Sequence, residues 1–508
     1  MRTKFLSTVL AATAVALMGS AASAQQGAQL RFGLAEDPDV LDPTFARTYV
    51  GRIVFASLCD KLFDIDEKLN IVPQLALSHE TSADGKTVTI RLRPGVKFHD
   101  GEPMDAEAVK FSLERHLNSQ GSFRRPELAA LDKVEVTDPL TVRLLLKTPF
   151  SPLLSQLTDR AGMMVSPKAA KEAGDRFGQK PVCAGPFRFV ERLQQDRIVV
   201  ERFPEYWNKD AVHLDRITYV PIVDSTVRLA NLRSGQLDVI ERVLATDINE
   251  VRNNNRLRLA TVTEIGYQSM TINVGKGDPA KEPLGSDPRV RQALELSIDR
   301  DAINQVVFDE EYVPGNQWVS PENPYYQQKF PVPKRDVAKA KKLLQEAGVK
   351  TPLTIDYMVP QNPETRQTAE VIQAMAAEVG FDMKIRVVEF ATSLKEAEEG
   401  RFQAYMLNWS GRPDPDGNIY IFAKSKAPQN YGGYSNPQVD AWLDEARTKS
   451  DPAERKAIYE KVTETFLKEG SLIYLFHRRW FVAHTAKLEG LKLLPDGLVR
   501  VVGLKLTP

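Results

Sequence analysis

The sequence is poor in the residues that carry most catalytic and metal-binding chemistry. Its 508 residues include only two cysteines and six histidines, and the histidines show no H-E-x-x-H or comparable ligand spacing. A G-x-S-x-G nucleophile elbow and a phosphate-binding P-loop are also missing from the sequence. His99 and Asp100 form the most metal-like pair, but the glycine after them predicts a turn. We therefore expect no catalytic residue, no metal site, no cofactor and no enzymatic activity.

An excess of charge of one sign is likewise missing. Lysine plus arginine and aspartate plus glutamate each total 67, and this balance argues against a nucleic-acid partner or an anionic membrane surface. Long apolar runs are confined to the start of the chain, so no later stretch reaches the roughly 20 apolar residues of a membrane-spanning helix.

The first 24 residues have the three parts of a secretory signal sequence. Arg2 and Lys4 are basic, residues 5–18 are apolar, and Ala22, Ser23 and Ala24 form a small-residue cleavage site. An uncleaved anchor is the alternative. Because no cysteine follows the cleavage site, we expect a signal peptide that is cleaved after Ala24 and a protein that is released into the periplasm without a lipid anchor.

Cys59 and Cys183 are the two cysteines. In an oxidising compartment such an isolated pair is predicted to form a disulfide. Two unpaired buried thiols remain the alternative, because the sequence does not give the distance between them.

The length and the pattern of apolar residues indicate an α/β protein with more than one lobe. A mature chain of this length exceeds the ~250–300 residues at which a single core stops growing. Val88, Ile90 and Leu92 alternate with polar residues, as in a half-buried strand, and similar hairpin patterns continue to residue 146. From about residue 285 onward, predicted helices alternate with strands, which is typical of a mostly parallel sheet.

Several segments, in order along nearly the whole mature chain, resemble one family. They are DGKTVTIRLRPGVKFHDGEPMDAEAVKFSLER (84–115), AGPFRFVE (184–191), ERFPEYW (201–207), SGQLDVI (234–240), DPRVRQALELSIDR (287–300) and AKKLLQEAG (340–348). The family is the extracellular solute-binding proteins, family 5, of dipeptide, oligopeptide and nickel ABC importers. The resemblance implies a two-lobed fold of the type II periplasmic binding proteins, with a β-rich subdomain inserted in lobe 1.

The resemblance also implies how the chain divides. After the signal peptide (1–24), lobe 1 is expected in residues 25–58 and 182–275, the inserted subdomain in 59–181, lobe 2 in 276–474, and a return to lobe 1 in 475–508. The ligand would be enclosed between the lobes, and closure would deliver it to an inner-membrane permease. We expect the protein to act as a monomer.

One proline- and glycine-rich segment, residues 409–418, is predicted to be the recognition loop. It contains Trp409, Arg412, Asp414 and Asp416. Peptide-binding relatives carry an aspartate shortly after the tryptophan for the ligand's ammonium, and Arg412 stands near that position here. An arginine offers a bidentate fork to a carboxylate or phosphate, so we expect Arg412 to contact an anionic end of the ligand, with Asp414 or Asp416 binding an amine.

Further candidates come from neighbouring segments. Trp409 is expected to form an apolar or cation–π wall, and Tyr49 lies in a segment that borders the ligand in relatives. Arg366 is the arginine nearest to the position where some dipeptide-binding relatives hold the ligand carboxylate. Tyr434 follows the recognition loop. Each of these residues could instead be structural.

The predicted function is therefore the periplasmic substrate-binding component of an ABC importer. Its ligand is expected to be a short peptide or a peptide-like anionic or zwitterionic small molecule. The alternatives are a periplasmic peptidase or hydrolase, and a peptide-sensing or chaperone-like binding protein.

Overall fold

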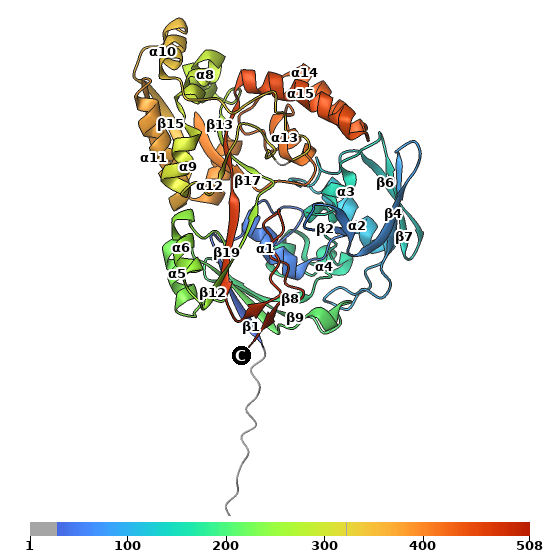
Figure 1. The fold of residues 1–508 in the computed structure, drawn as a ribbon. Helices are drawn as coiled ribbons and strands as arrows, with labels where there is room; N and C mark the ends of the chain where they lie inside the picture. Colours follow the sequence, from blue (N-terminus) through green and yellow to red (C-terminus); the bar gives the residue numbers. More distant parts are fainter. Residues whose placement is uncertain (1–27, 322, 508) are drawn as a thin grey trace, which may run out of the picture.

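The computed structural model describes residues 28–321 and 323–507 (Figure 1). The expected signal peptide lies outside these residues. Among the helices of the described part, none combines the length and the apolar composition needed to cross a membrane.

Lobe 1 is built on a seven-stranded sheet, at the bottom of Figure 1. The strand order is β12-β19-β11-β1-β10-β9-β8, and β1 lies between two strands parallel to it, β10 and β11. The strands are β1 (Gln29–Leu34), β8 (Phe187–Leu193), β9 (Arg197–Arg202), β10 (Arg216–Pro221), β11 (Val239–Ile240), β12 (Leu257–Thr263) and β19 (Arg479–Thr485). The apolar helix α1 (Tyr49–Leu58) is almost wholly buried in this lobe, together with β1 and its neighbours. Smaller elements are α5 (Ser225–Arg233), α6 (Ile248–Arg252), β20 (Leu488–Glu489) and β21 (Lys505–Leu506).

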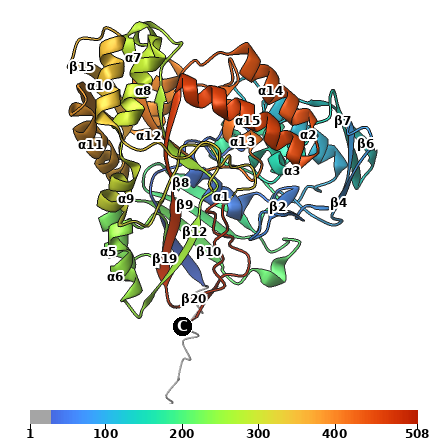
Figure 2. The same ribbon diagram turned by 45° about the horizontal axis from the view of Figure 1, so that its top comes forward.

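Lobe 2 is built on a six-stranded sheet of order β14-β18-β13-β17-β15-β16. The strands are β13 (Tyr267–Ile272), β14 (Val313–Pro314), β15 (Leu353–Pro360), β16 (Phe381–Val388), β17 (Ala404–Trp409) and β18 (Leu472–His477). The central strands β13 and β18 are buried along their whole length, as expected for a sheet that is covered on both faces. Figure 2 shows the helices around it: α7 (Pro283–Ser286), α8 (Pro288–Ser297), α9 (Arg300–Phe308), α10 (Val337–Glu346), α11 (Pro363–Ala377), α12 (Phe390–Glu398), α13 (Asp416–Ala423), α14 (Pro437–Thr448) and α15 (Pro452–Glu469).

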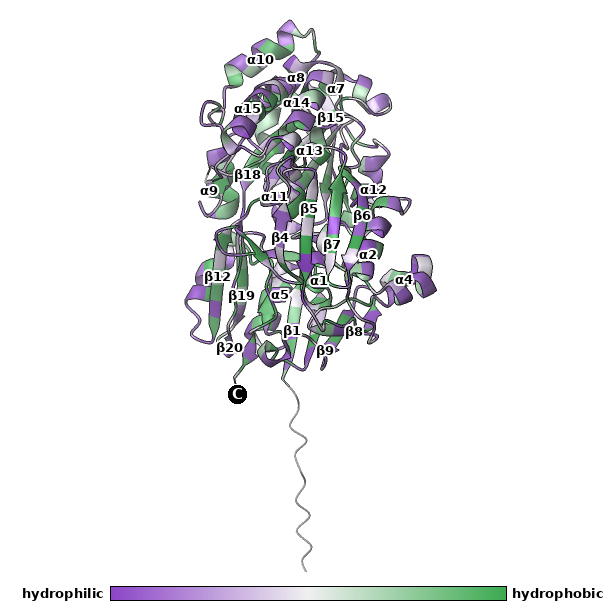
Figure 3. Ribbon diagram, turned by 90° about the vertical axis from the view of Figure 1, so that its right-hand side faces the viewer, coloured by the Kyte–Doolittle hydropathy of each residue, from purple (hydrophilic) through white to green (hydrophobic). Residues whose placement is uncertain are grey.

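The inserted subdomain carries a four-stranded antiparallel sheet of order β4-β5-β7-β6, which faces the viewer in Figure 3. Val88, Ile90 and Leu92 of β5 are buried, as their alternation predicts. The Asp105 side chain accepts a hydrogen bond from Ala108 N and so caps α2, which packs on this sheet. The elements are β2 (Phe63–Ile65), β3 (Ile71–Pro73), β4 (Ala76–Thr81), β5 (Thr87–Leu92), α2 (Ala106–Asn118), β6 (Leu131–Asp138), β7 (Thr141–Leu146), α3 (Leu153–Gln156) and α4 (Pro167–Ala173).

The chain passes between the two large sheets at two adjacent places. β12 of lobe 1 leads through residues 264–266 into β13 of lobe 2, and β18 of lobe 2 leads through Arg478 into β19 of lobe 1. The first crossing comes earlier than the expected boundary at residue 275, because β13 already pairs with β17 of lobe 2. Gly266 is needed at this crossing, since a Cβ there would lie 1.8 Å from Trp409 O.

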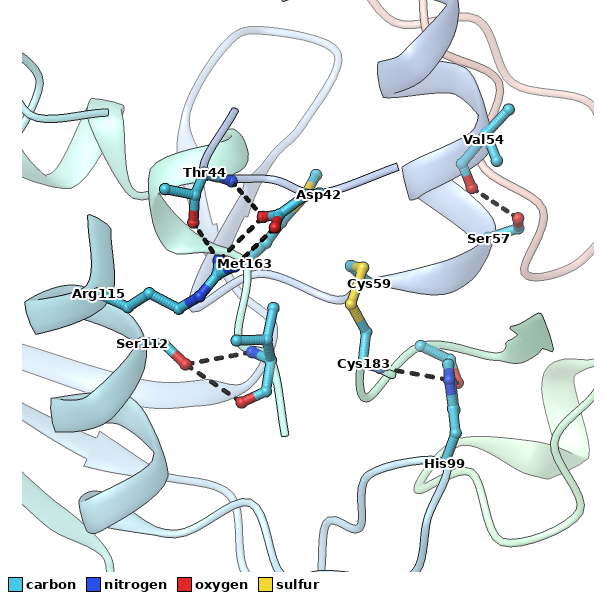
Figure 4. Close-up of a disulfide and its surroundings, with 12 residues drawn as sticks. Asp42, Thr44, Val54, Ser57, Cys59, His99, Ser112, Arg115, Met163 and Cys183 are labelled. Carbon is cyan, nitrogen blue, oxygen red and sulfur yellow. Dashed lines mark hydrogen bonds and ion pairs between the residues drawn. A yellow bond between two sulfur atoms is a disulfide. The ribbon is translucent and has the colours of Figure 1, made fainter. Parts of the chain in front are cut away.

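A disulfide joins Cys59, at the end of α1, to Cys183, just before β8 (Figure 4). Both cysteines are buried. The bond fastens the two ends of the inserted subdomain to each other, because one cysteine lies where the chain leaves lobe 1 and the other where it returns. The pairing agrees with the prediction from an isolated cysteine pair.

Candidate functional site: a cleft between the lobes

A cavity of about 70 Å³ lies between the two lobes, beside both crossing segments. Its lining combines residues from the carboxyl ends of lobe 1 strands with residues of three lobe 2 strands and the loops that follow them. The lining residues are Glu36, Arg47, Tyr49, Arg242, Gln268, Pro360, Gln361, Asn362, Thr365, Phe390, Met406, Asn408, Trp409, Ser410 and Arg478. The lobes enclose little free space here, because a volume of this size holds only a few water molecules.

Two of the expected site residues, Tyr49 and Trp409, line this cavity. The Tyr49 ring stacks on Trp480 at 4.4 Å between centroids, and its hydroxyl donates to Gly497 O at 2.5 Å. Trp409 Nε1 donates to Asn418 Oδ1 at 2.9 Å. Both rings are therefore held in fixed orientations before a ligand arrives, because their polar atoms already have partners within the protein.

Arg412 is not part of the cavity lining. Its guanidinium lies 4.4 Å from the centre of the Trp409 ring, and its Nε lies 2.9 Å from Asp159 Oδ2 of the inserted subdomain. Its backbone N–H donates to Asn418 Oδ1 at 2.7 Å, which folds the loop back on itself. The side chain is 3% exposed. Asp159 thus occupies the Arg412 guanidinium and competes with the contact that we expected Arg412 to make with a ligand in this cavity.

Asp414 and Asp416 are also engaged within the protein. Asp414 accepts two hydrogen bonds from Arg455 of α15, at 2.8 and 2.7 Å. Asp416, the first residue of α13, accepts two from Arg447 of α14, at 2.7 and 2.9 Å. Both pairs have the bidentate geometry of strong guanidinium–carboxylate contacts. They anchor the recognition loop to lobe 2 and leave neither carboxylate directed at the cavity.

The remaining two candidates lie elsewhere. Arg366, on α11, has an exposed side chain whose Nε donates to Glu370 at 2.8 Å. Tyr434 is buried with its ring edge-to-face on Phe466, and it borders a different, smaller cavity. The structure therefore gathers Tyr49 and Trp409 at the cleft and places Arg366 and Tyr434 outside it.

Four charged residues in the lining were missed by sequence reasoning: Glu36, Arg47, Arg242 and Arg478. A signal for two of them exists in the order of the strands. Glu36 follows β1, and Arg242 follows β11, which runs parallel to β1 beside it. Ligands of open α/β sheets bind outside the carboxyl ends of such strands, so a charged residue just after each of two adjacent parallel strands marks a site.

Each arginine of the lining has a carboxylate near it. Arg242 Nη1 lies 3.6 Å from Glu36 Oε1, and Arg242 also lies over the Tyr49 ring at 5.2 Å. Arg47, two residues before α1, forms an ion pair with Glu398 of α12, which directly links the two lobes. Arg478 Nε lies 3.9 Å from Glu364 Oε1, and its Nη2 donates to the amide oxygen Gln268 Oε1 at 2.6 Å.

Burial raises the pKa values of two acids in this region. Burial raises the pKa of Glu36, an effect that Arg242 opposes. At the first crossing segment, burial raises the pKa of Glu264 to about 7, although its Oε1 accepts the Arg478 N–H at 2.9 Å. The two crossings are thus tied to each other by a backbone-to-carboxylate hydrogen bond next to the cavity.

Within residues 28–321 and 323–507, no three or more histidine, cysteine, aspartate or glutamate side chains are placed to share an ion. His99, the most metal-like residue of the sequence, contacts Gly185 O at 3.1 Å and packs on Phe203.

Two lobes joined by paired crossing strands, with a lined cavity between them, define a substrate-binding protein of the periplasmic binding-protein class. The chain belongs to the bacterial extracellular solute-binding proteins, family 5, whose model matches residues 70–430. Members of this family are the binding components of ABC importers. The predicted family, fold class and importer role are thereby confirmed.

Several relatives of the chain are similar over almost their whole length. The glutathione-binding protein GsiB of Pectobacterium atrosepticum is 33% identical over 470 residues, which cover 90% of each chain. GsiB of Escherichia coli K12 is 30% identical over 495 residues, or 95% of each chain. Among solved structures, the periplasmic binding protein AgaA of A. tumefaciens R10, in complex with agropinic acid, is 27% identical with a TM-score of 0.86, covering 94% of this chain and 99% of its own.

Proposed function

We propose that this protein is the periplasmic binding component of an importer for a small, peptide-like ligand that carries carboxylates and an ammonium group. The observation that carries the proposal is the charge of the cleft lining, which contains Arg47, Arg242 and Arg478 together with Glu36. Guanidinium groups bind carboxylates through paired hydrogen bonds, and the Glu36 carboxylate suits an ammonium group.

The lining gives these groups separate roles. Arg242 and Glu36 come from lobe 1, whereas Arg478 lies at the crossing between the lobes. Trp409 and Tyr49 supply flat apolar walls between the charged groups. A zwitterionic ligand can therefore engage both lobes at once, and only the closed form provides all of these contacts. Its binding shifts the equilibrium between open and closed forms by its greater affinity for the closed form.

The relatives favour the same class of ligand. GsiB is a glutathione-binding protein and AgaA was solved with agropinic acid, and glutathione is a tripeptide with two carboxylates and one ammonium group. We infer that this chain takes glutathione or a compound of similar charge and size, and that the protein acts as a cleaved, periplasmic monomer. In this proposal Arg242 and Arg478, and not Arg412 as the sequence suggested, bind the carboxylates of the ligand in the cleft.

The test begins with native mass spectrometry of the protein from its own periplasm, with identification of any molecule released on denaturation. Titration calorimetry with glutathione then compares the wild type with Arg242→Gln and with Arg366→Gln, an exposed arginine outside the cleft. Loss of one charge-assisted contact costs about 1.5–3 kcal/mol, so Arg242→Gln should weaken binding by roughly 10- to 100-fold, whereas Arg366→Gln should bind as the wild type does.

Two results would overturn this proposal. A released ligand without a carboxylate would remove the role of the arginines. Conversion of added glutathione or dipeptide into products would favour the peptidase alternative. Circular dichroism of Arg242→Gln, and binding by Arg242→Lys, separate a lost contact from a lost fold.

A further inference from the structure

A second group of charges lies beneath the recognition loop, where lobe 2 meets α1 of lobe 1 and the inserted subdomain. It consists of four arginines and two acids: Arg52, Arg124, Glu127, Asp159, Arg160 and Arg412. We call these six residues the arginine cluster. Every one of them is at most 5% exposed.

The arginine cluster carries an excess of positive charge. Asp159 contacts three arginines: its Oδ1 lies 3.2 Å from Arg52 Nε and 3.9 Å from Arg160 Nε, and its Oδ2 lies 2.9 Å from Arg412 Nε. Glu127 pairs only with Arg124, at 2.5 Å. Four guanidinium groups therefore share two carboxylates, which leaves two positive charges uncompensated by the acids of the cluster.

Buried charges without partners are costly, and most in proteins are paired. The neighbouring ion pairs of the same loop obey this rule, with one carboxylate for each of Arg447 and Arg455. In the arginine cluster, by contrast, Arg124 Nε, Arg160 Nε and Arg412 Nη2 find no acceptor among the described residues. Burial and the neighbouring arginines lower the pKa of Arg160 well below its usual range, which reflects the same excess.

The backbone only partly compensates these groups. Ala46 O accepts from Arg160 Nη1 at 2.8 Å and from Arg124 Nη2 at 3.4 Å, and Gly411 O accepts from Arg412 Nη1 at 2.7 Å. These carbonyls bring partial charges but no full negative charge. A separate cavity of about 280 Å³ is lined by Arg52 and Asp159, and by none of Arg124, Arg160 and Arg412, so it meets the cluster on one side only.

We propose that the arginine cluster is an anion-binding site, in which a small anion bridges the guanidinium groups of Arg124, Arg160 and Arg412. The anion is either a free inorganic ion or a carboxylate of the bound ligand. Because Arg412 belongs to lobe 2 and the other two to the inserted subdomain, an anion here stabilises the closed form. The site is distinct from the cleft lining, and a free anion would bind it whatever the identity of the ligand.

The first experiment measures thermal unfolding of the full chain in sodium chloride, bromide, sulfate or gluconate at constant ionic strength. The variant is Arg160→Met, and the matched control is Arg300→Met. Arg300 is equally buried but has its own acid, Glu295, at 3.0 Å. The wild type and Arg300→Met should gain stability with the small anions relative to gluconate, in proportion to the logarithm of their concentration, and Arg160→Met should lose this gain.

The second experiment is crystallographic and does not rely on a variant. Crystals soaked in bromide should show an anomalous peak within hydrogen-bonding distance of Arg160 and Arg412. If glutathione removes the peak, and chloride weakens glutathione binding, the ligand's carboxylate is the natural occupant. If both bind together, the occupant is a free anion.

Two outcomes would overturn the anion site. One is bromide peaks only elsewhere in the molecule. The other is an anion dependence of stability that is the same in Arg160→Met and Arg300→Met. Failure of glutathione to bind would count against the proposed function alone, since neither the stability series nor the bromide peak requires it.

Discussion

Arg412 of the recognition loop and Asp159 of the inserted subdomain form a buried ion pair across the lobe interface, with 2.9 Å between Nε and Oδ2. The loop that ends β17 is thus fixed at the far side of the cleft as well as in its own lobe. This contact gives Asp159 an importance that its position in the sequence does not reveal.

We predict that Asp159→Asn is strongly destabilising. The variant leaves Arg52 and Arg412 buried without their carboxylate, and breaking a buried pair in this way costs about 3–5 kcal/mol. Urea unfolding measures the effect, with Glu370→Gln as the control, because the exposed Glu370–Arg366 pair should contribute at most about 1 kcal/mol. Equal stability of the two variants would contradict a structural role for Asp159.

Removal of the disulfide should also lower stability. Cys59 and Cys183 are separated by 124 residues, and a cross-link that closes a loop of this length stabilises by about 4–5 kcal/mol in the chain-entropy model. The double variant Cys59→Ser/Cys183→Ser should therefore unfold at lower urea concentration than the oxidised wild type. Reduction of the wild type should reproduce most of the loss, while a reductant should leave the double variant unchanged.

The stability of the crossing segment should depend on pH through Glu264. Its pKa is about 7 in the folded protein, against 4.5 for an ordinary glutamate, so the folded state holds the proton more tightly. The favourable contribution is complete below pH 4.5 and is lost as the pH rises through 7. Relative to Glu264→Gln, which cannot ionise, the wild type should lose on the order of 3 kcal/mol between these limits.

Melting temperatures of both proteins at pH 5 and pH 8 measure this difference. Other buried groups, among them Asp60 and His477, titrate in both proteins and cancel in the comparison. A difference between the two proteins that stays constant from pH 5 to pH 8 would show that Glu264 titrates normally.

Trp409 should matter for both ligand binding and stability. Trp409→Ala removes a cleft wall, the Nε1 hydrogen bond to Asn418 and the face beneath Arg412, and large-to-small changes of this kind cost about 3–5 kcal/mol. Trp409→Phe retains an apolar ring and should recover most of the ligand affinity. Calorimetry with glutathione measures the effect on binding, and thermal unfolding measures the effect on stability. If the Ala and Phe variants bound glutathione with equal affinity, the aromatic ring at position 409 would have no role in binding.

The sequence was informative where local chemistry decides the structure. The alternation in β5, the Asp105 cap of α2 and the Cys59–Cys183 pair could all be predicted, because each depends on a periodicity, a single cap or a count of cysteines. The turn-rich segment 409–418 was found for the same reason, by its prolines and glycines, and its role in ligand recognition stays a prediction.

The partners of the charged residues could not be predicted. Asp414 is paired with Arg455 and Asp416 with Arg447, which lie 41 and 31 residues further along the chain. Arg412 pairs with a residue more than two hundred positions before it. The packing of helices and lobes decides which charges meet at such separations. The residue types in the loop therefore correctly predicted strong charged contacts, but they did not show which residues would be the partners.

The segment 409–418 touches three parts of the molecule at once: Trp409 the cleft, Arg412 the inserted subdomain, and Asp414 and Asp416 the outer helices of lobe 2. We expect a movement of this short segment at the cleft to move the inserted subdomain and the outer helices of lobe 2 as well. A permease meets only the exterior of its binding protein. With such a linkage, the binding of a ligand in the cleft would change the shape of the outer surface that the permease contacts.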